Sequence, residues 1–401
     1  MERTLKWLWL TNLSRMYSEK ITLLLDRFDT IDDIYAAKRE DFSDIDNITK
    51  ADIDRLCDKS LEKAEEIYRK TDAVGGHIID FDSELYPERL KRIATPPYVL
   101  YVRGNLEVIK NTITVGVVGT REYSLYGEKV TKDICSELSE NGLCIVSGMA
   151  RGIDTISATA ALKAGGKTVA VLGCGVDIVY PPENGKLMDL IIKNGAVVSE
   201  YPPMSQPYPS HFPERNRIIA GLSDCLLVTE APAKSGSLIT ARYAYEMGRH
   251  IFSVPGSVYK INCVGTNNLI KAGAIPVTMT KDIFDVYAIE LKNIEKPQKP
   301  EFIDIDYPVR KEEKQEGKDI FSPDLRKPKK KKSVDDEEFS SLSADEKVIL
   351  KEIIKSGQLS VDEIIRATKM DAQSVNSKLP LMEIMGIIKK LPGNLYTVLE
   401  D

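Results

Sequence analysis

Residues 114–173 read TVGVVGTREYSLYGEKVTKDICSELSENGLCIVSGMARGIDTISATAALKAGGKTVAVLG, in which three β-branched runs alternate with two helix-like stretches. Four further runs follow: AVVSEY (196–201), CLLVTE (225–230), IFSVPG (251–256) and IPVT (275–278). Nearly continuous apolar strands of this kind are typical of a parallel sheet that is covered on both faces. The sequence therefore predicts an α/β fold, a doubly wound Rossmann-like sheet of about seven strands, which binds ligands at the carboxyl ends of its strands.

The segments before the sheet have a different pattern. Residues 1–70 show helical periodicity and predict a small all-α domain. Residues 71–110 contain short apolar pieces around Tyr86-Pro87 and Pro96-Pro97, which we interpret as a lead-in. We assign residues 71–290 to the sheet domain.

The segments after the sheet predict a linker and a second small domain. Residues 291–338 are rich in proline and charge and have few apolar residues to bury, which is typical of a solvated spacer. Residues 339–401 give three helical segments, with caps predicted at Ser360 and Asp371, and two short strands around Gly393-Asn394. This pattern favours a winged-helix domain. It carries eight Lys and Arg against nine Asp and Glu from residue 340 onward, which favours a protein-contacting role over strong binding of duplex DNA.

Composition limits the classes of function. The 401 residues carry 55 Lys and Arg against 61 Asp and Glu, so the chain cannot hold nucleic acid by bulk positive charge. No apolar run approaches the roughly 20 residues of a membrane span, and the N-terminus lacks a signal-peptide pattern. We therefore expect a cytoplasmic protein with no membrane partner. The six scattered cysteines and three distant histidines predict neither a metal site nor a catalytic triad.

Two glycine-containing turns follow the first two strands. In the first, Gly119 permits close approach of the backbone to a ligand, and Arg121 after Thr120 supplies a donor fork suited to phosphate. A tight turn with a surface arginine would have the same residues. The second turn, SGMARGID (147–154), could cradle an anion at a helix start, although Asp154 more often caps its own helix. Its spacing is not the GxGxxG of dinucleotide sites.

Besides these two turns, a third group of candidate binding residues consists of Phe212, Arg215, Asn216 and Arg217. An aromatic ring beside two arginines and an asparagine can stack a base and hold its phosphates, as a single strand requires. Helical phase prevents the two arginines from pointing the same way, so we expect one of them to be structural.

The fourth group follows the strand that ends at Glu230 and consists of Lys234, Ser235, Gly236 and Ser237. A small Gly/Ser loop entering a helix beside a lysine is a plausible phosphate nest, and a simple N-cap is the alternative. The loop is not GxxxxGK[ST], which argues against ATP hydrolysis of that type. Together the four constellations predict that Arg121, Arg217 and Lys234 meet at one sheet edge without a nucleophile, metal cluster or general base. This favours a binding groove over an active site.

At this point the motifs resemble a known family. The runs GVVGTREYSLYG, IVSGMARGIDTISATAAL, FPERNRIIAGLS and TEAPAKSGSLITARYAYEMGR closely resemble, in this order, the DNA-processing protein A (DprA, also called Smf) family. The resemblance covers essentially all of residues 75–285. It implies a bacterial cytoplasmic protein that binds single-stranded DNA during natural transformation, protects it and loads RecA recombinase onto it. It further implies a homodimer formed through the Rossmann-like domain, no cofactor and no catalytic activity.

The resemblance also implies which residues bind DNA. The family's Gly-Ser-Arg motif matches Gly119-Thr120-Arg121 with threonine in place of serine, its Phe-Pro-x-Arg-Asn-Arg run matches 212–217, and its basic residue before Ser-Gly-Ser matches Lys234. The expected DNA-binding residues are Gly119, Thr120, Arg121, Phe212, Arg215, Asn216, Arg217, Lys234, Ser235, Gly236 and Ser237. The N-terminal domain resembles a sterile-alpha-motif or helix-hairpin-helix region, but DNIT at 46–49 lacks the glycines of a DNA-binding hairpin.

Two other classes of protein compete with this interpretation. A LOG-like nucleotide phosphoribohydrolase has a similar fold and a phosphate at a glycine-rich helix start, but follows a GGxGT motif with a catalytic glutamate. Here SGSLITA is followed by Arg242 and Tyr243, and the next acid is Glu246. A winged-helix transcription regulator would bind a specific duplex tightly, against which the near-neutral tail argues.

Overall fold

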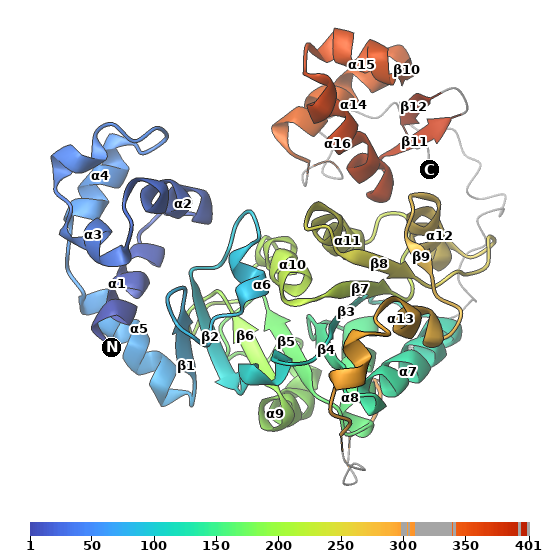
Figure 1. The fold of residues 1–401 in the computed structure, drawn as a ribbon, viewed down its shortest axis with the longest axis horizontal. Helices are drawn as coiled ribbons and strands as arrows, with labels where there is room; N and C mark the ends of the chain where they lie inside the picture. The colour runs from blue at the N-terminus through green and yellow to red at the C-terminus, as the bar shows by residue number, and fades with distance from the viewer. Residues whose placement is uncertain (298–302, 304, 309–338, 340–341, 392–393, 399–401) are drawn as a thin grey trace.

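The protein is described by a computed structural model that covers residues 1–297, 303, 305–308, 339, 342–391 and 394–398. Figure 1 shows a central sheet with a group of helices beside one edge and a small second domain next to one helical layer. Most of the segment predicted to be a linker lies outside the described residues, including the lysine cluster at 327–332. Ile305, in the described part of this segment, is buried in the core. The residues around it therefore pack against the protein and are not a fully solvated spacer.

The central sheet has nine strands in the order β1-β2-β6-β5-β4-β3-β7-β8-β9. The seven strands β3 to β9 pair in parallel and match the seven predicted apolar runs, so the predicted doubly wound parallel sheet is confirmed. Their bounds are β3 Thr114–Val118, β4 Cys144–Ser147, β5 Thr168–Leu172, β6 Ala196–Ser199, β7 Cys225–Val228, β8 His250–Ser253 and β9 Ile275–Pro276.

The interpretation of residues 71–110 as a lead-in, and with it the number of strands, was wrong. Strand β2 (Val99–Gly104) pairs antiparallel with β6, and β1 (His77–Asp80) pairs antiparallel with β2. The proline pair just before β2 indicates a turn, and it obscured the short apolar run that follows. These two strands form the edge against which the N-terminal helices pack.

Helices cover both faces of the sheet (Figure 1). Alternation along a strand assigns the faces: Val117 packs with α7 and α8, whereas Val118 packs with α10 and α11. One layer holds α7 Leu125–Glu140, α8 Ile153–Lys163, α9 Gly185–Asn194 and α13 Lys281–Val286. The other holds α6 Glu88–Lys91, α10 His211–Leu222, α11 Gly236–Glu246 and α12 Val264–Lys271. Short 3₁₀ helices lie at Arg39–Phe42, Leu106–Ile109, Pro182–Asn184, Ile261–Cys263 and Glu290–Asn293.

The N-terminal helices form the small helical unit that periodicity predicts. They are α1 Glu2–Thr11, α2 Ser18–Arg27, α3 Ile31–Ala36, α4 Lys50–Cys57 and α5 Glu62–Ala73. Trp7 is fully buried and stacks on Tyr98, with ring centroids 5.5 Å apart, so the core of this unit continues into the sheet domain.

The C-terminal domain is the predicted winged helix, with one strand more than expected. Its elements are α14 Ala344–Ser356, β10 Gln358–Ser360, α15 Val361–Thr368, α16 Ala372–Ile384, β11 Ile388–Leu391 and β12 Leu395–Val398. Both predicted caps are present, at Ser360 and Asp371. The domain packs on α11, where Ile384 is buried in the core of the sheet domain and Arg242 pairs with Glu346. Within the described residues, no helix is both long enough and apolar enough to span a membrane.

Candidate nucleic-acid interface

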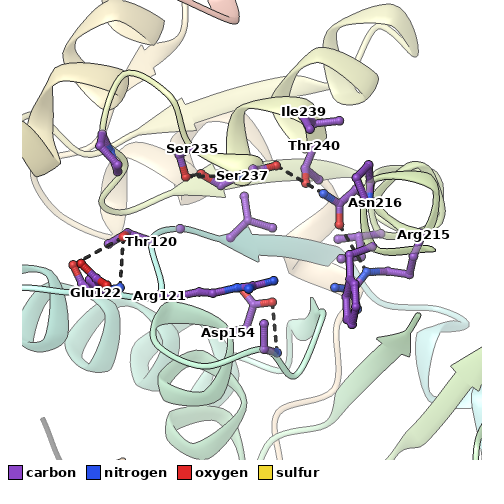
Figure 2. A pocket seen from close by; sticks show the side chains of 18 of the residues that line it. Thr120, Arg121, Glu122, Asp154, Arg215, Asn216, Ser235, Ser237, Ile239 and Thr240 are labelled. Carbon is purple, nitrogen blue, oxygen red and sulfur yellow. Dashed lines mark hydrogen bonds between the residues drawn. The ribbon is translucent and has the colours of Figure 1, made fainter. Parts of the chain in front are cut away.

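A cleft of about 600 Å³ opens at the carboxyl ends of β3 and β7. The chain runs from β3 towards β6 on one side and from β7 towards β9 on the other, so the cleft lies where the strand order reverses. All four predicted constellations contribute to its lining, as do residues from more distant loops. Figure 2 shows Thr120 and Arg121 with Asp154 on one side, Ser235 and Ser237 on the other, and Arg215 and Asn216 at the end between them.

The turn after β3 is held close to its neighbours by Gly119. A β-carbon at this position would lie 2.6 Å from Ile153 Cγ1 and 2.8 Å from the carbonyl oxygen of Glu230, so only glycine fits. Thr120 is buried, and its Oγ1 accepts the amide of Glu122 at 3.1 Å. Arg121 is exposed, and its guanidinium carbon lies 5.9 Å from the centre of the Phe212 ring. The turn therefore presents a cation beside an aromatic face at the cleft.

The loop from 147 to 154 supplies a buried carboxylate to the cleft. Asp154 Oδ2 accepts the amide of Ala150, in the loop before α8, at 3.4 Å. The N-cap of α8 is Gly152, without a side-chain bond, so Asp154 does not cap its own helix as the alternative interpretation expected. Burial raises the pKa of Asp154 to about 6, and the positive charge of Arg215 opposes this increase. Arg151 points to Glu183 instead, with 2.5 Å between Nε and Oε1.

Arg215 ties the wall of the cleft together. It is 4% exposed, and its Nη1 donates to the carbonyls of Gly148, at 2.8 Å, and Val171. Its Nε donates to Asn216 Oδ1 at 3.2 Å, and Asn216 in turn donates to the carbonyl of Gly236 at 3.3 Å. The chain of bonds joins α10 to the start of α11, and burial lowers the pKa of Arg215. Arg215 is thus a structural residue that adds positive charge beneath the surface.

Arg217 does not join this cleft, which corrects the expectation that it meets Arg121 and Lys234. Two positions along a helix differ by about 200°, so Arg217 faces away from Arg215 and lines a second cleft. Its Nη2 donates to both carboxylate oxygens of Glu200, at 2.6 and 2.8 Å. Arg217 is 8% exposed, so both arginines of the motif are buried, where only one was expected to be structural.

The loop before α11 combines the two alternatives that the sequence left open. Ser235 is the N-cap of α11, and its Oγ accepts the amide of Ser237 at 3.3 Å. Lys234 and Gly236 are nevertheless exposed at the cleft, and a β-carbon on Gly236 would meet no atom within 4 Å. An open helix N-terminus beside a lysine is favourable for an anion.

Several lining residues were missed because they come from loops with no recognisable motif. Tyr180 lies in the loop after β5, with its ring centre 5.2 Å from that of Phe212. Asn262, after β8, donates to the carbonyl of Glu122 at 2.7 Å, and Pro207 and Pro209 lie in the segment before α10. The only feature of the sequence that could have indicated these residues is their position after a strand, which brings them to the same sheet edge.

The charges and side chains of the cleft suit phosphate binding. Exposed Arg121 and Lys234 and buried Arg215 outnumber Asp154 and Glu122 in the lining, which contains no histidine or cysteine. Among the described residues, no group of three His, Cys, Asp or Glu side chains could hold a metal ion. The arrangement can hold anionic groups between two cations and stack a planar group near Phe212.

Comparisons with known proteins agree with this architecture. The DNA recombination-mediator protein A family matches residues 77–288, and the DprA winged helix domain matches residues 336–394. Protein Smf from Synechocystis is 36% identical over 321 residues, which cover 79% of this chain and 78% of that protein. DNA processing protein DprA from Bacillus subtilis is 42% identical over 211 residues, 53% of this chain and 71% of that protein.

Solved structures give the same result. The X-ray structure of DNA processing protein A from Streptococcus pneumoniae has a TM-score of 0.61 and 36% sequence identity, and the match covers 70% of this chain and 95% of that chain. The family match spans more than half of the chain and includes all four constellations of the cleft. This chain therefore belongs to the DNA recombination-mediator protein A (DprA/Smf) family.

Proposed function

We propose that the cleft at the carboxyl ends of β3 and β7 binds single-stranded DNA. The observation that carries this proposal is the exposed Arg121 guanidinium 5.9 Å from the Phe212 ring, in one cleft with Lys234 and the open start of α11. Phosphates of a strand would bind to the two cations and to the backbone at the exposed Gly236, where α11 begins. A base would stack on Phe212, which requires an unpaired strand because the bases of a duplex are already stacked on one another.

The proposal divides the predicted residues by role. Arg121, Lys234 and Phe212 contact the strand, while Gly119, Thr120, Ser235, Gly236 and Ser237 supply backbone around it. Arg215 and Asn216 hold the wall in shape through their bonds to Gly148 and Gly236. Arg217 contributes only through the packing of α10, because it pairs with Glu200.

We further propose that the chain acts as a cytoplasmic homodimer that protects incoming DNA in natural transformation and loads RecA onto it. Membership in a family of recombination mediators supports this role. We expect no cofactor and no catalysis, since the loop after β7 departs from the GGxGT motif and following glutamate of the LOG-like hydrolases. A nucleotide-release assay on nucleoside monophosphates should then yield no free base.

Fluorescence anisotropy of labelled oligonucleotides tests DNA binding. We expect preference for a single strand over a duplex, and Arg121→Ala should weaken binding about tenfold and lower the salt slope by roughly 0.7 for the lost phosphate contact. Arg39→Ala is the control, because it also removes one exposed arginine, but from the N-terminal helices, where it pairs with Asp54. Equal loss in the two variants would show that net charge, rather than this cleft, determines affinity.

A further inference from the structure

The winged-helix domain contacts the loop that carries Lys234. Helix α16 of this domain packs on α11 and α12 of the sheet domain (Figure 1). In the turn that follows α16, a β-carbon on Gly386 would lie 2.8 Å from the carbonyl oxygen of Ala233, the residue before Lys234. Only a residue without a side chain lets the two backbones approach this closely. The proposed DNA-binding role has so far assigned no function to this contact.

The loop from β7 to α11 is otherwise held by the sheet domain. Three of its carbonyls accept hydrogen bonds from neighbouring elements, and the bonds run from Thr120 N to Glu230 O at 2.8 Å, from Gly265 N to Ala231 O at 2.8 Å, and from Asn216 Nδ2 to Gly236 O at 3.3 Å. Among the described residues, no donor bonds to the carbonyl of Ala233 between them. The backbone beside Lys234 is therefore supported through its contact with Gly386 of the winged-helix domain.

Few side chains hold the winged-helix domain in this position. Ile384 is 2% exposed and packs in the core of the sheet domain. Arg242 of α11 pairs with Glu346, with 3.3 Å between Nη2 and Oε2, and its Nη1 lies 3.6 Å from the sulfur of Met385. A cleft of about 510 Å³ remains between α11 and the domain. Since the winged helix also has a core of its own, it can leave α11 without unfolding.

We propose that the docked winged-helix domain is a positioning element for DNA binding, and that it holds Lys234 through Gly386. This inference rests on the proposed binding of a single strand in the cleft at the carboxyl ends of β3 and β7, the first cleft. Docking fixes the backbone before Lys234 and so preorganises this cation for a phosphate. Docking and strand binding are then linked, because each must strengthen the other by the same factor.

Two glycine substitutions within the winged-helix domain test the proposal. Gly386→Ala places a β-carbon against Ala233. Gly357→Ala is the matched control, because both glycines follow a helix with positive φ, +67° at Gly386 and +80° at Gly357, but a β-carbon on Gly357 would meet no atom within 4 Å. The two variants share the cost of a left-handed alanine, and only Gly386→Ala disturbs docking.

Anisotropy titrations with an all-thymidine strand measure the effect on the full chain. We expect Gly386→Ala to bind the strand about fivefold more weakly than Gly357→Ala, which is at the lower end of coupling between sites. Equal affinities of the two variants would overturn the proposal. Tighter binding by Gly386→Ala would also overturn it, because the docked domain would then inhibit the cleft.

A double-mutant cycle identifies the residue through which Gly386 acts. If it acts through Lys234, then Gly386→Ala should cost little further affinity in a chain that already carries Lys234→Ala. Equal losses in the two backgrounds would contradict this route. The exposed lysines of β11 give the other test: if Lys389→Ala and Lys390→Ala together weaken binding as much as Gly386→Ala, the domain contacts the strand directly and the positioning role is wrong.

Hydrogen exchange measures docking separately from affinity. A saturating all-thymidine strand should slow amide exchange in α16 in the wild type and in Gly357→Ala, and much less in Lys234→Ala. Normal strand binding with unchanged exchange in α16 would reject this inference alone. Absence of strand binding by the wild type would reject the proposed function, and this inference with it.

Discussion

The two sides of α10 line clefts of similar volume and opposite charge. One side turns Arg215 and Asn216 towards the sheet edge with Arg121 and Lys234, and the other turns Arg217 towards Glu200 and a group of tyrosines. Both arginines are buried, yet only the first cleft is basic, because the charge of Arg217 is neutralised by its ion pair with Glu200. A basic sequence motif therefore indicates an anion-binding site only where its cations are not neutralised by buried carboxylates.

The largest effect should follow from removing the buried support of the basic cleft. Arg215→Ala leaves Asp154 without its nearby cation and loses the bonds to Gly148 and Val171. We expect the free energy of unfolding to fall by about 4 kcal/mol, as when one partner of a buried pair is removed. Chemical denaturation measures this, and a loss below about 1 kcal/mol would show that Arg215 is not structural.

Asp154 should make stability depend on pH. Its pKa is 3.8 ordinarily and about 6 in the folded protein, so between these values the folded state binds the proton more tightly than the unfolded state. The contribution of Asp154 to the free energy of unfolding should therefore decrease as pH rises from about 4 to 6, by roughly 3 kcal/mol, and stay constant above pH 7. The difference between the wild type and Asp154→Asn across pH isolates this group, and a difference that does not change with pH would contradict it.

Loss of either exposed cation should weaken DNA binding without affecting the fold. Lys234→Ala should weaken single-strand affinity about tenfold, and the combination with Arg121→Ala should weaken it about a hundredfold if each cation binds its own phosphate. Anisotropy titrations measure the affinities, and unfolding curves check that stability is unchanged. Normal affinity in the double variant would place the strand elsewhere.

The smallest effect should come from the acidic side of α10. Glu214→Gln removes a negative charge from the second cleft, which should tighten binding of an all-thymidine strand by no more than about twofold, because interactions between exposed charges are weak. Anisotropy at low salt resolves a change of this size. Weaker binding in this variant would mean that the Glu214 carboxylate makes a favourable contact with the strand, which would contradict the expected repulsion.

Sequence patterns predicted most of the fold because the apolar strands are nearly continuous and each is followed by a turn. All seven parallel strands, the helical N-terminal unit and the winged helix were found in this way. Strands β1, β2 and β10 were missed for two reasons. Strand β2 directly follows a proline pair that indicates a turn, and β1 and β10, with four and three residues, are recognised only by their pairing with β2 and β12.

The sequence predicted the lining residues of the first cleft well where they directly follow a strand. It predicted them less well on α10, where the helical phase determines which side chains face the cleft. Arg121 and Lys234 reach the expected edge, since the carboxyl ends of parallel strands lie together. The side of α10 that Arg217 faces depends on packing against Glu200, which no local motif encodes. Tyr180 and Asn262 enter the cleft from loops whose course only the folded chain determines.

Photocross-linking tests whether a single strand lies in the cleft at the carboxyl ends of β3 and β7. A thymidine oligomer containing 4-thiothymidine would be bound to the protein with both clefts intact, irradiated and mapped by mass spectrometry. We expect cross-links at Phe212, Tyr180 and the 234–237 loop, and these should decrease in Arg121→Ala. Cross-links confined to Tyr17 and Tyr201 of the second cleft, unchanged by that substitution, would contradict this placement of the strand.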